Sequence, residues 1–229
     1  MGNIGENTGK ITAIITAGGT STRFGIKNKL LEKIHSKEVI KHTVEAFLGV
    51  NEIETIIICA NISIIEELNN IFEGENKIKI IEGGNTRQQS VFNGLKSCSG
   101  SDYVLIHDGA RPMISTETIK QAIEMVKLKK ALTVATKTID TIKQVDENLK
   151  IIKTIDRSSL FNTQTPQAFE YNLINNAHKK LAGANFTDDA GMLESLGETV
   201  YILEGDYKNI KITTQSDIEL AKIYLNKVN

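Results

Sequence analysis

The sequence predicts an α/β protein with a Rossmann-like, mostly parallel sheet, helices on both faces of that sheet, and a protruding β-hairpin arm. Two observations predict the sheet: short apolar runs alternate with amphipathic stretches along the chain, and the runs are apolar at nearly every position. Continuous runs rich in Ile and Val are typical of parallel strands that are covered on both sides. A third observation, one long stretch of alternating apolar and polar residues, predicts the arm.

The first part of the chain supplies the regular alternation of strands and helices. Because strand and helix patterns follow one another, we expect right-handed crossover connections between parallel strands. The expected strands are Ile11–Ala17, Ile53–Ala60, Lys77–Glu82, Tyr103–His107 and Ala131–Thr136. The expected helices are Glu38–Leu48, Ile64–Phe72, Thr86–Ser97 and Ser115–Lys129.

The stretch TIDTIKQVDENLKIIKTI, residues 138–155, breaks this rhythm. Apolar and polar residues alternate on both sides of DEN, which is a hairpin pattern with little helical periodicity. Since an isolated two-stranded ribbon is marginally stable at best, we expect the arm, at about residues 138–156, to pack on a second copy of the chain. Two helical patterns, a strand at Val200–Leu203 and a final helix at Ser216–Leu225 complete the expected fold.

The composition of the 229 residues, 40% hydrophobic and 24% charged with a formal net charge of -1, is that of an ordinary globular protein. It lacks the basic excess of a general nucleic-acid binder, and no apolar stretch approaches the roughly 18 residues of a membrane span. We interpret residues 1–9 as a disordered polar tail and residues 10–229 as one domain. Because Cys59 and Cys98 form no CxxC or Cys/His cluster, we expect reduced thiols in a cytoplasmic protein.

Three unusual loops each follow a predicted strand. They are the opening loop at residues 16–29, GGNTRQQS at residues 83–90, and HDGARP at residues 107–112. Ligands of open α/β sheets bind outside the carboxyl ends of the strands. We therefore expect these three loops to converge on one ligand.

The opening loop, TAGGTSTRFGIKNK, combines small residues with two cations. Gly18 and Gly19 let the backbone approach a ligand closely, and such a turn presents backbone N–H groups to an anion. Arg23 offers a planar fork for two phosphate oxygens and Lys29 is a compact point charge, so the pair suits a polyphosphate. The spacing is neither GxxxxGK[ST] nor GxGxxG. The alternative interpretation is a surface loop with two solvated cations.

The pattern AGG-x-x-x-RF-G-x-x-x-K in this loop resembles sugar-phosphate nucleotidyltransferases, and IHDGARP resembles their branch of polyol-phosphate cytidylyltransferases. DTIK, TIDRSSLFNTQTPQAF, TDDAGMLESLG and NIKITT then follow in the order seen in the 2-C-methyl-D-erythritol 4-phosphate cytidylyltransferase family. The resemblance covers the chain from about Ile11 onward and implies the nucleotidyltransferase fold. It also implies that CMP is transferred from CTP to 2-C-methyl-D-erythritol 4-phosphate, with release of pyrophosphate, in the non-mevalonate isoprenoid pathway.

The resemblance implies roles on the nucleotide side of the reaction. Arg23 and Lys29 would contact the triphosphate and stabilise the negative charge that spreads over it in the transition state. Asp108 would help to hold Mg²⁺, the implied cofactor, whereas its neighbour His107 is read as structural. The alternative role for Asp108 is that of a cap or turn residue at a strand end. The implied nucleotide-binding residues are Thr16, Ala17, Gly18, Gly19, Gly83, Gly84, Asn85, Ser90 and Asp108.

The resemblance also implies an acceptor site and a homodimer. Thr141 and Arg157 lie on opposite sides of the predicted hairpin and resemble the pair that binds the polyol phosphate, and in this family the arm reaches into the neighbouring subunit. Lys211 would contact the phosphates and orient the attacking monoester. The implied substrate-binding residues are Arg111, Thr141, Arg157, Thr165 and Lys211. The implied catalytic residues are Arg23, Lys29, Arg157 and Lys211.

Three alternatives remain open at this level. The nearest is a cytidylyltransferase for ribitol 5-phosphate or another pentitol phosphate, which the motifs IDRSS and TDDA disfavour. The second is a nucleotide-binding regulatory protein that has lost turnover, which the presence of all the implied cations disfavours. The third is a nucleic-acid-binding module, which the near-zero net charge disfavours.

Overall fold

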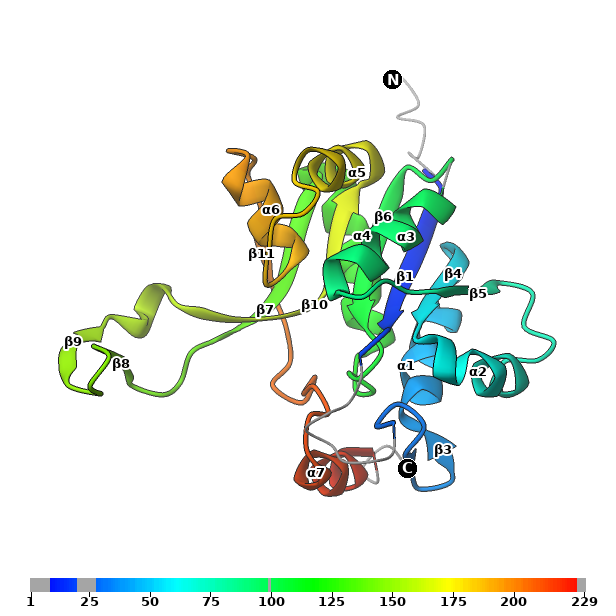
Figure 1. Ribbon diagram of the computed structural model, residues 1–229, viewed down its shortest axis with the longest axis horizontal. Coiled ribbons are helices and arrows are strands. Elements are labelled where there is room, and N and C mark those ends of the chain that lie inside the picture. The colour runs from blue at the N-terminus through cyan, green and yellow to red at the C-terminus, as the bar shows by residue number, and fades with distance from the viewer. Residues whose placement is uncertain (1–8, 20–27, 99, 226–229) are drawn as a thin grey trace, which may run out of the picture.

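The computed structural model describes residues 9–19, 28–98 and 100–225. Its central sheet is built from β1 (Ile11–Ala17), β4 (Ile53–Ala60), β5 (Ile78–Glu82), β6 (Tyr103–Asp108), β7 (Ala131–Lys137), β10 (Phe161–Glu170) and β11 (Tyr201–Glu204). Among the described residues these strands form one seven-stranded sheet in the order β11-β7-β10-β6-β1-β4-β5 (Figure 1). The pairs β1–β4, β1–β6, β4–β5 and β7–β11 are parallel, which confirms the predicted mostly parallel sheet.

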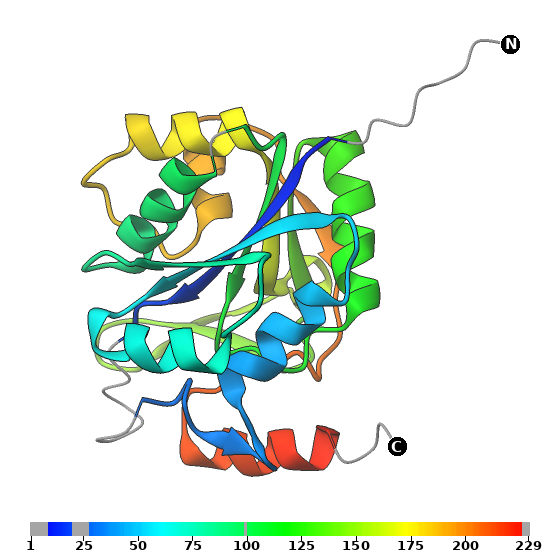
Figure 2. The same ribbon diagram turned by 90° about the vertical axis from the view of Figure 1, so that its right-hand side faces the viewer.

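Helices cover both faces of the sheet, as the sequence predicts (Figure 2). Side chains alternate along β1, so Ile15 packs in one apolar cluster and its neighbour Ile14 packs in the other. The cluster of Ile15 includes residues of α1 (Val39–Leu48), α2 (Ile65–Ile71) and α4 (Thr116–Lys129). The cluster of Ile14 includes residues of α3 (Arg87–Ser97), α5 (Tyr171–Lys180) and α6 (Asp189–Ser195).

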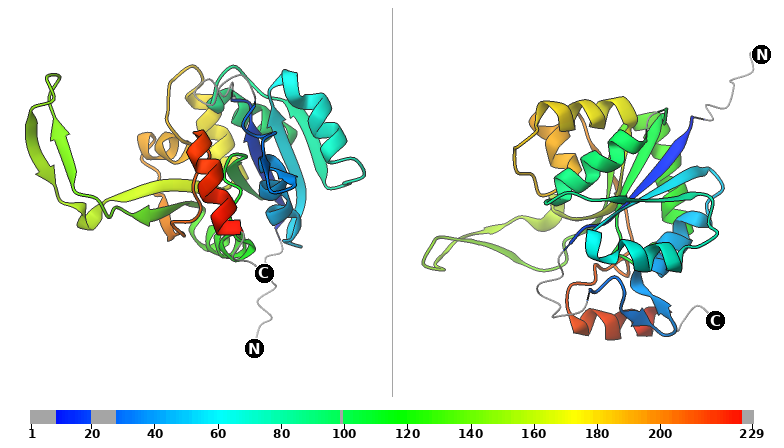
Figure 3. Two further views of the ribbon diagram at one scale, coloured as in Figure 1. Left: turned by 90° about the horizontal axis from the view of Figure 1, so that it is seen from below. Right: turned by 45° about the vertical axis from the view of Figure 1, so that its right-hand side comes forward.

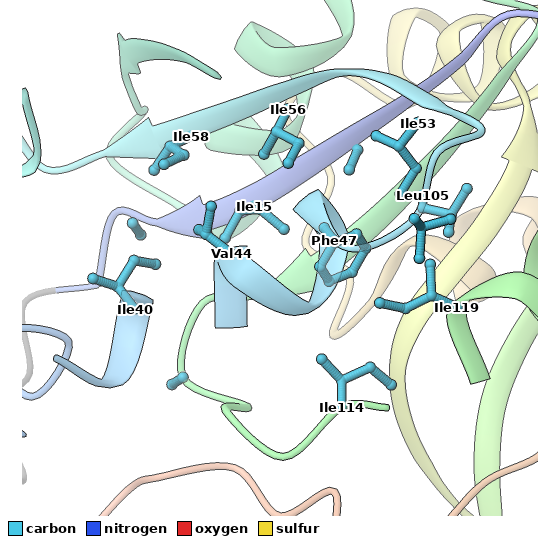
Figure 4. Packing of buried hydrophobic residues seen from close by; sticks show 14 of the residues in the cluster. Ile15, Ile40, Val44, Phe47, Ile53, Ile56, Ile58, Leu105, Ile114 and Ile119 are labelled. Atoms are coloured by element: carbon cyan, nitrogen blue, oxygen red, sulfur yellow. The ribbon is translucent and has the colours of Figure 1, made fainter. Parts of the chain in front are cut away.

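The larger cluster is centred on the contact between α1 and the sheet (Figure 4). Phe47 of α1 is fully buried and lies among Ile53 of β4, Leu105 of β6 and Ile119 of α4. Since burying a Phe side chain stabilises a protein by roughly 1.5–3 kcal/mol, this contact anchors α1 and α4 to the sheet.

The strand β10 was not predicted, although it lies near the middle of the sheet. It runs antiparallel to both of its neighbours, β6 and β7. Its sequence, FNTQTPQAFE, is polar and contains Pro166, which has no N–H for a ladder and argues against a central strand. The pairing with β7 shifts register between Thr163 and Gln167, so Pro166 falls within the irregular stretch.

The predicted arm is present and projects away from the sheet (Figures 1 and 3). Its two strands, β8 (Ile142–Val145) and β9 (Ile151–Ile155), pair antiparallel and are joined by a turn that Asp146 stabilises. The carboxylate of Asp146 accepts hydrogen bonds from the backbone N–H groups of Asn148 at 3.0 Å and Lys150 at 2.9 Å. The exposed apolar side chains of the arm are Ile139, Ile142, Val145, Leu149, Ile151 and Ile152.

A small ribbon and the last helix lie together below the sheet (Figure 2), and Ile34 and Ile218 join them to the larger apolar cluster. The ribbon pairs β2 (Lys33–Ile34) with β3 (Lys37–Glu38), and the Nε2 atom of His35 lies 3.3 Å from the backbone oxygen of Lys222 in α7 (Gln215–Leu225). Short 3₁₀ turns at Ile62–Ile64 and Arg157–Ser159 complete the described elements. None of the described helices is long and apolar enough to cross a membrane. The predicted tail lies outside the described residues except for Gly9.

Substituting Gly94 with alanine is expected to lower the free energy of unfolding, although alanine is the better helix former by roughly 1 kcal/mol. A Cβ on Gly94 of α3 would lie 2.7 Å from Cγ2 of Ile14 and 2.9 Å from Sγ of Cys59. Overpacking of this kind typically costs about 1–3 kcal/mol. Urea unfolding measures the change, and Lys96→Ala, on the exposed side of the same helix, is the control. An increase in stability for Gly94→Ala would contradict the close packing.

Candidate active site

The carboxyl ends of β1, β5 and β6 meet at one edge of the sheet, and the loops that follow them surround a cleft of about 270 Å³. Leu30, Thr86, Arg87 and Ala110 contribute to its walls. The predicted site residues that the structure brings together here are Thr16, Ala17, Gly18, Gly19, Lys29, Asn85, Ser90, Asp108 and Lys211. Arg23 belongs to residues 20–27, which lie outside the described part of the chain.

Ser90 fixes the loop at residues 83–90 and lies close to Gly18 of the opening loop. Its Oγ accepts a hydrogen bond from the backbone N–H of Gly84 at 2.9 Å and donates one to the backbone oxygen of Thr86 at 2.9 Å. A Cβ on either Gly18 or Gly83 would lie 2.9 Å from the same oxygen. Gly18 is therefore needed for the close approach of the opening loop to Ser90 of α3, and Gly83 for that of the second loop. Gly83 and Gly84 begin this second loop and are not among the described residues that line the cleft.

Asp108 is the buried carboxylate of the site and lies among three cations. Lys211 Nζ is 2.8 Å from its Oδ2, Arg111 Nε is 3.5 Å from the same oxygen, and Arg87 Nε is 3.5 Å from Oδ1. Burial alone would raise the pKa of Asp108, but Lys211, Arg87 and Arg111 outweigh burial and hold the pKa well below its usual range. Asp108 is therefore ionised at neutral pH.

Thr165 of β10 links Asp108 to its neighbour in the strand. The hydroxyl of Thr165 accepts a hydrogen bond from the backbone N–H of Asp108 at 3.1 Å and lies 3.0 Å from Nδ1 of His107. His107 is fully buried, its ring lies against Phe47, and burial lowers its pKa to about 3. His107 is thus a neutral packing residue at pH 7, which agrees with the structural role expected from the sequence. Thr165 fixes the end of β6.

The segment NIKITT brings Lys211 to the site from the far side of β10. Asn209 is buried, and its Nδ2 donates to the side-chain oxygen of Gln164 at 3.0 Å and to the backbone oxygen of Thr165 at 2.9 Å. Arg111 Nη1 donates to the backbone oxygen of Asn209 at 2.7 Å. These bonds fix the backbone that carries Lys211, whose side chain remains 41% exposed and faces the clefts.

A second cavity, of about 260 Å³, adjoins the first. Arg87, Asp108 and Lys211 line both cavities, so these three side chains form the wall between them. The second cavity is strongly polar; its remaining lining residues are Arg111, Thr163, Gln164, Thr165, Gln167, Thr187 and Asp188. Of the predicted substrate-binding residues, the structure brings Arg111, Thr165 and Lys211 together here.

The other two predicted substrate-binding residues lie on the arm. Thr141 and Arg157 are exposed at its base, and neither is among the described residues that line the two cavities. The guanidinium of Arg157 donates to the backbone oxygen of Ile139, across the base of the arm. Within a single chain, therefore, these two residues stand apart from Asp108 and Lys211.

Arg87 is a site residue that sequence reasoning missed. It lies in GGNTRQQS, from which the sequence analysis selected only the glycines, Asn85 and Ser90. A signal was available, because Arg87 is the first residue of α3, where the helix macrodipole disfavours a cation. An arginine at such a position indicates a carboxylate partner elsewhere in the fold, and Arg87 has two, Asp108 and Asp189.

Two adjoining cavities that share a wall of Arg87, Asp108 and Lys211 suit an enzyme that joins two phosphate-bearing substrates. At the carboxyl edge of a largely parallel sheet, beside a glycine-rich loop, such spaces are typical of nucleotide-binding enzymes. The class of protein that this fold and site define is the nucleotidyltransferases.

Comparison with known proteins gives the family. The model of the family described as 2-C-methyl-D-erythritol 4-phosphate cytidylyltransferase matches residues 11–227, and this chain belongs to that family. The enzyme of that name from Clostridium botulinum is 38% identical over 223 residues, which cover 95% of this chain and all of that protein. The enzyme of that name from Bacillus licheniformis is 40% identical over 218 residues, 93% of this chain and 94% of that protein.

Solved structures agree with this assignment. The crystal structure of 4-diphosphocytidyl-2C-methyl-D-erythritol synthase from Anaerococcus prevotii superposes with a TM-score of 0.87 at 33% identity, covering 96% of this chain and 97% of that one. The 2-C-methyl-D-erythritol 4-phosphate cytidylyltransferase of Francisella tularensis superposes with a TM-score of 0.80 at 29% identity, covering 93% and 99%. The predicted fold class and enzyme class are therefore confirmed.

Proposed function

We propose that this chain transfers CMP from CTP to 2-C-methyl-D-erythritol 4-phosphate. In this reaction an oxygen of the polyol phosphate attacks the α-phosphorus of CTP, the bond from that phosphorus to the bridging oxygen breaks, and pyrophosphate leaves with the electron pair. The observation that carries the proposal is the pair of cavities that share Arg87, Asp108 and Lys211. CTP in the first cavity and the polyol phosphate in the second would meet at that shared wall.

The first cavity suits the nucleotide. Gly18 and Gly19 leave room for the phosphates to approach the backbone, and Asn85 stands at the mouth of the second glycine loop, where we place the cytosine. Lys29 lines the same cleft and supplies positive charge for the triphosphate. Arg23 is proposed for the same task on the strength of its place in the family motif.

The second cavity suits the polyol phosphate. Arg111 and Lys211 bring positive charge to it, and backbone and hydroxyl oxygens of the β10 segment offer acceptors for the hydroxyls of the substrate. Thr165 acts mainly by holding the end of β6, since its own hydroxyl is engaged by His107 and by the backbone of Asp108. Lys211, at the shared wall, would orient the attacking oxygen and stabilise charge in the transition state.

We propose Mg²⁺ as the cofactor, with Asp108 as its protein ligand. The described residues contain no cluster of three or more His, Cys, Asp or Glu side chains that could hold a metal without the substrate. This fits Mg²⁺, which is commonly bound by one or two carboxylates together with substrate phosphates. Oδ1 of Asp108 lies 3.4 Å from Oγ1 of Thr16 and 3.5 Å from Nε of Arg87, whereas Oδ2 lies 2.8 Å from Nζ of Lys211, so we assign Oδ1 to the cation. When bound, the ion would neutralise part of the triphosphate charge.

We also propose that two copies of the chain form a homodimer through the arm. The apolar side chains of the arm are exposed in the single chain: Leu149 is 80% exposed and Ile152 is 59% exposed. Thr141 and Arg157 would then reach the acceptor cavity of the neighbouring copy, which explains why they lie apart from the acceptor cavity of their own chain. The cytoplasmic location and the division into one domain with a polar tail stay predictions.

Pyrophosphate release from CTP tests the substrate assignment. We expect turnover that requires a divalent cation and is fastest with 2-C-methyl-D-erythritol 4-phosphate in a panel that includes ribitol 5-phosphate and other pentitol phosphates. The expectation follows from the family match over residues 11–227. EDTA is the control for the cation. Faster turnover with ribitol 5-phosphate would overturn the proposed acceptor, and a rate unaffected by EDTA would overturn the proposed cofactor.

A further inference from the structure

The motifs TPQ and TDDA lie in the fold as two halves of one buried polar network. Gln167 of β10 is fully buried, and its Oε1 accepts the backbone N–H of Asp189 at 2.9 Å. Its Nε2 donates to the carboxylate of Asp188 at 2.8 Å and to the hydroxyl of Thr133 at 2.9 Å. Gln167 thus ties the first residues of α6 to the centre of the sheet, where their position cannot vary without leaving buried polar groups unpaired.

Asp189 is the residue that this tie places. It is 1% exposed, and its carboxylate faces two partners. Oδ2 accepts from Arg87 Nη1 at 2.7 Å, and Oδ1 lies 3.1 Å from Nε2 of His178 on α5. Burial would raise the pKa of Asp189, but the charge of Arg87 and the bond to His178 outweigh burial and lower it. A buried anion is therefore held directly behind Arg87 and is not itself among the described residues that line the two cavities.

Arg87 joins this buried anion to the site. One edge of its guanidinium, Nη1, makes the close contact to Asp189, and the other, Nε, faces Asp108 at 3.5 Å. The distances decide which partner is the anchor: the 2.7 Å contact fixes Arg87, and the longer one leaves Asp108 free to respond to Lys211 and to ligands. Arg87 lines both cavities, so a shift of its side chain would move the wall where the two substrates meet.

We infer that Asp189, placed by Gln167, is a positioning residue that acts through Arg87 to hold Asp108 and the wall between the two substrate cavities. Asp189 touches neither cavity and so makes no contact with CTP or the polyol phosphate. A planar arginine is required between Asp189 and Asp108, because it can contact two carboxylates with separate edges of its guanidinium, which a lysine cannot do. The inference rests on the proposed function for its turnover readout but not for its binding readout.

The test is a double-mutant cycle on Asp189 and Arg87. Asp189→Asn keeps the shape of the side chain and removes its charge, and Arg87→Ala removes the link to Asp108. Loss of an outer partner of this kind typically lowers activity about 10–100-fold. We expect that range for kcat/KM in each single variant, together with about tenfold weaker binding of CTP by calorimetry. Asp102→Asn is the matched control, since that carboxylate accepts from the backbone N–H of Lys10 at 2.7 Å at the opposite end of β6.

The double variant separates positioning from folding. If Asp189 acts through Arg87, adding Asp189→Asn to Arg87→Ala changes kcat/KM and the Kd for CTP by less than about twofold. The melting temperature should show a partial rescue. Arg87→Ala leaves Asp189 buried without its cation, which lowers the melting temperature, and adding Asp189→Asn restores part of that loss. Arg87→Lys keeps a charge in the site and serves as the second variant if Arg87→Ala does not fold. It is expected to lose kcat/KM while melting closer to the wild type.

The outcomes that would overturn the inference are specific. Wild-type kcat/KM and CTP affinity in Asp189→Asn would mean that Asp189 has no bearing on the site. Equal losses from Asp189→Asn in the wild-type and Arg87→Ala chains would mean that it acts by another route. If the wild-type chain bound CTP but released no pyrophosphate with any acceptor, the proposed function would fail, and the binding cycle would still decide the inference.

Discussion

Replacement of Lys211 with alanine is expected to lower kcat by about 10²–10³-fold while raising the KM for CTP much less. Removing one preorganised donor to developing charge has an effect of this size in comparable sites. Lys211 Nζ lies 2.8 Å from Asp108 at the wall shared by the two cavities, where the attacking and leaving oxygens would both be close. A group that acts mainly in the transition state changes kcat more than ground-state binding.

Steady-state pyrophosphate release, with each substrate varied in turn, measures both constants. Lys208→Ala is the matched control, because Lys208 precedes Lys211 by three residues in the same loop and is not among the described residues that line the cavities. Its kinetics should match those of the wild type. A Lys211→Ala variant with near-normal kcat and a raised KM would assign Lys211 to substrate binding alone.

Mixing two nearly inactive variants is expected to restore activity if each active site is shared between two chains. Lys29→Ala damages the nucleotide cleft, and Arg157→Ala damages the arm that we place in the neighbouring copy's acceptor cavity. In a mixed dimer one site would carry both changes and the other neither. With equal amounts and free exchange, about half of the dimers are mixed and each has one working site, so about a quarter of the wild-type rate should return.

Exchange itself must be measured, for example with differently tagged chains that are purified as mixed dimers. A mixture of Lys29→Ala with Lys211→Ala is the control, since both residues line the same cleft. Each chain of that mixed dimer therefore carries one damaged cleft. That mixture should stay inactive where the clefts are built within one chain. If the Lys29→Ala and Arg157→Ala mixture also stays inactive after proven exchange, each chain builds its own acceptor site.

The strands of this fold were predictable where burial alone specifies them. β1 and β4 have the predicted bounds because each is a continuous apolar run that is covered on both faces and ends at a change of composition. β10 was not predicted, because its central residues are polar and do not form an apolar run. Gln164, Thr165 and Gln167 form hydrogen bonds to three different segments. The residues next to them in sequence do not indicate such distant hydrogen-bond partners.

The same reason limits what could be predicted of the site. The glycines of the two loops were recognisable because close backbone approach demands them locally. Arg87 and Asp189 were not, since their contact joins residues 102 apart in sequence and depends on how α3 and α6 pack. Asn209 likewise reads as an ordinary loop residue, and only the fold shows that it pins the segment that carries Lys211.

The arm leaves the sheet and returns to it at adjacent points, since Lys137 at the end of β7 pairs with Phe161 at the start of β10. Its exposed side chains are not part of the two buried clusters found among the described residues. Substitutions in the arm would therefore leave the melting temperature of the isolated chain nearly unchanged. Where the arm joins two copies, the same substitutions would emerge as a loss of specific activity on dilution. Variants of this protein need to be graded at more than one concentration before a change in the arm is called neutral.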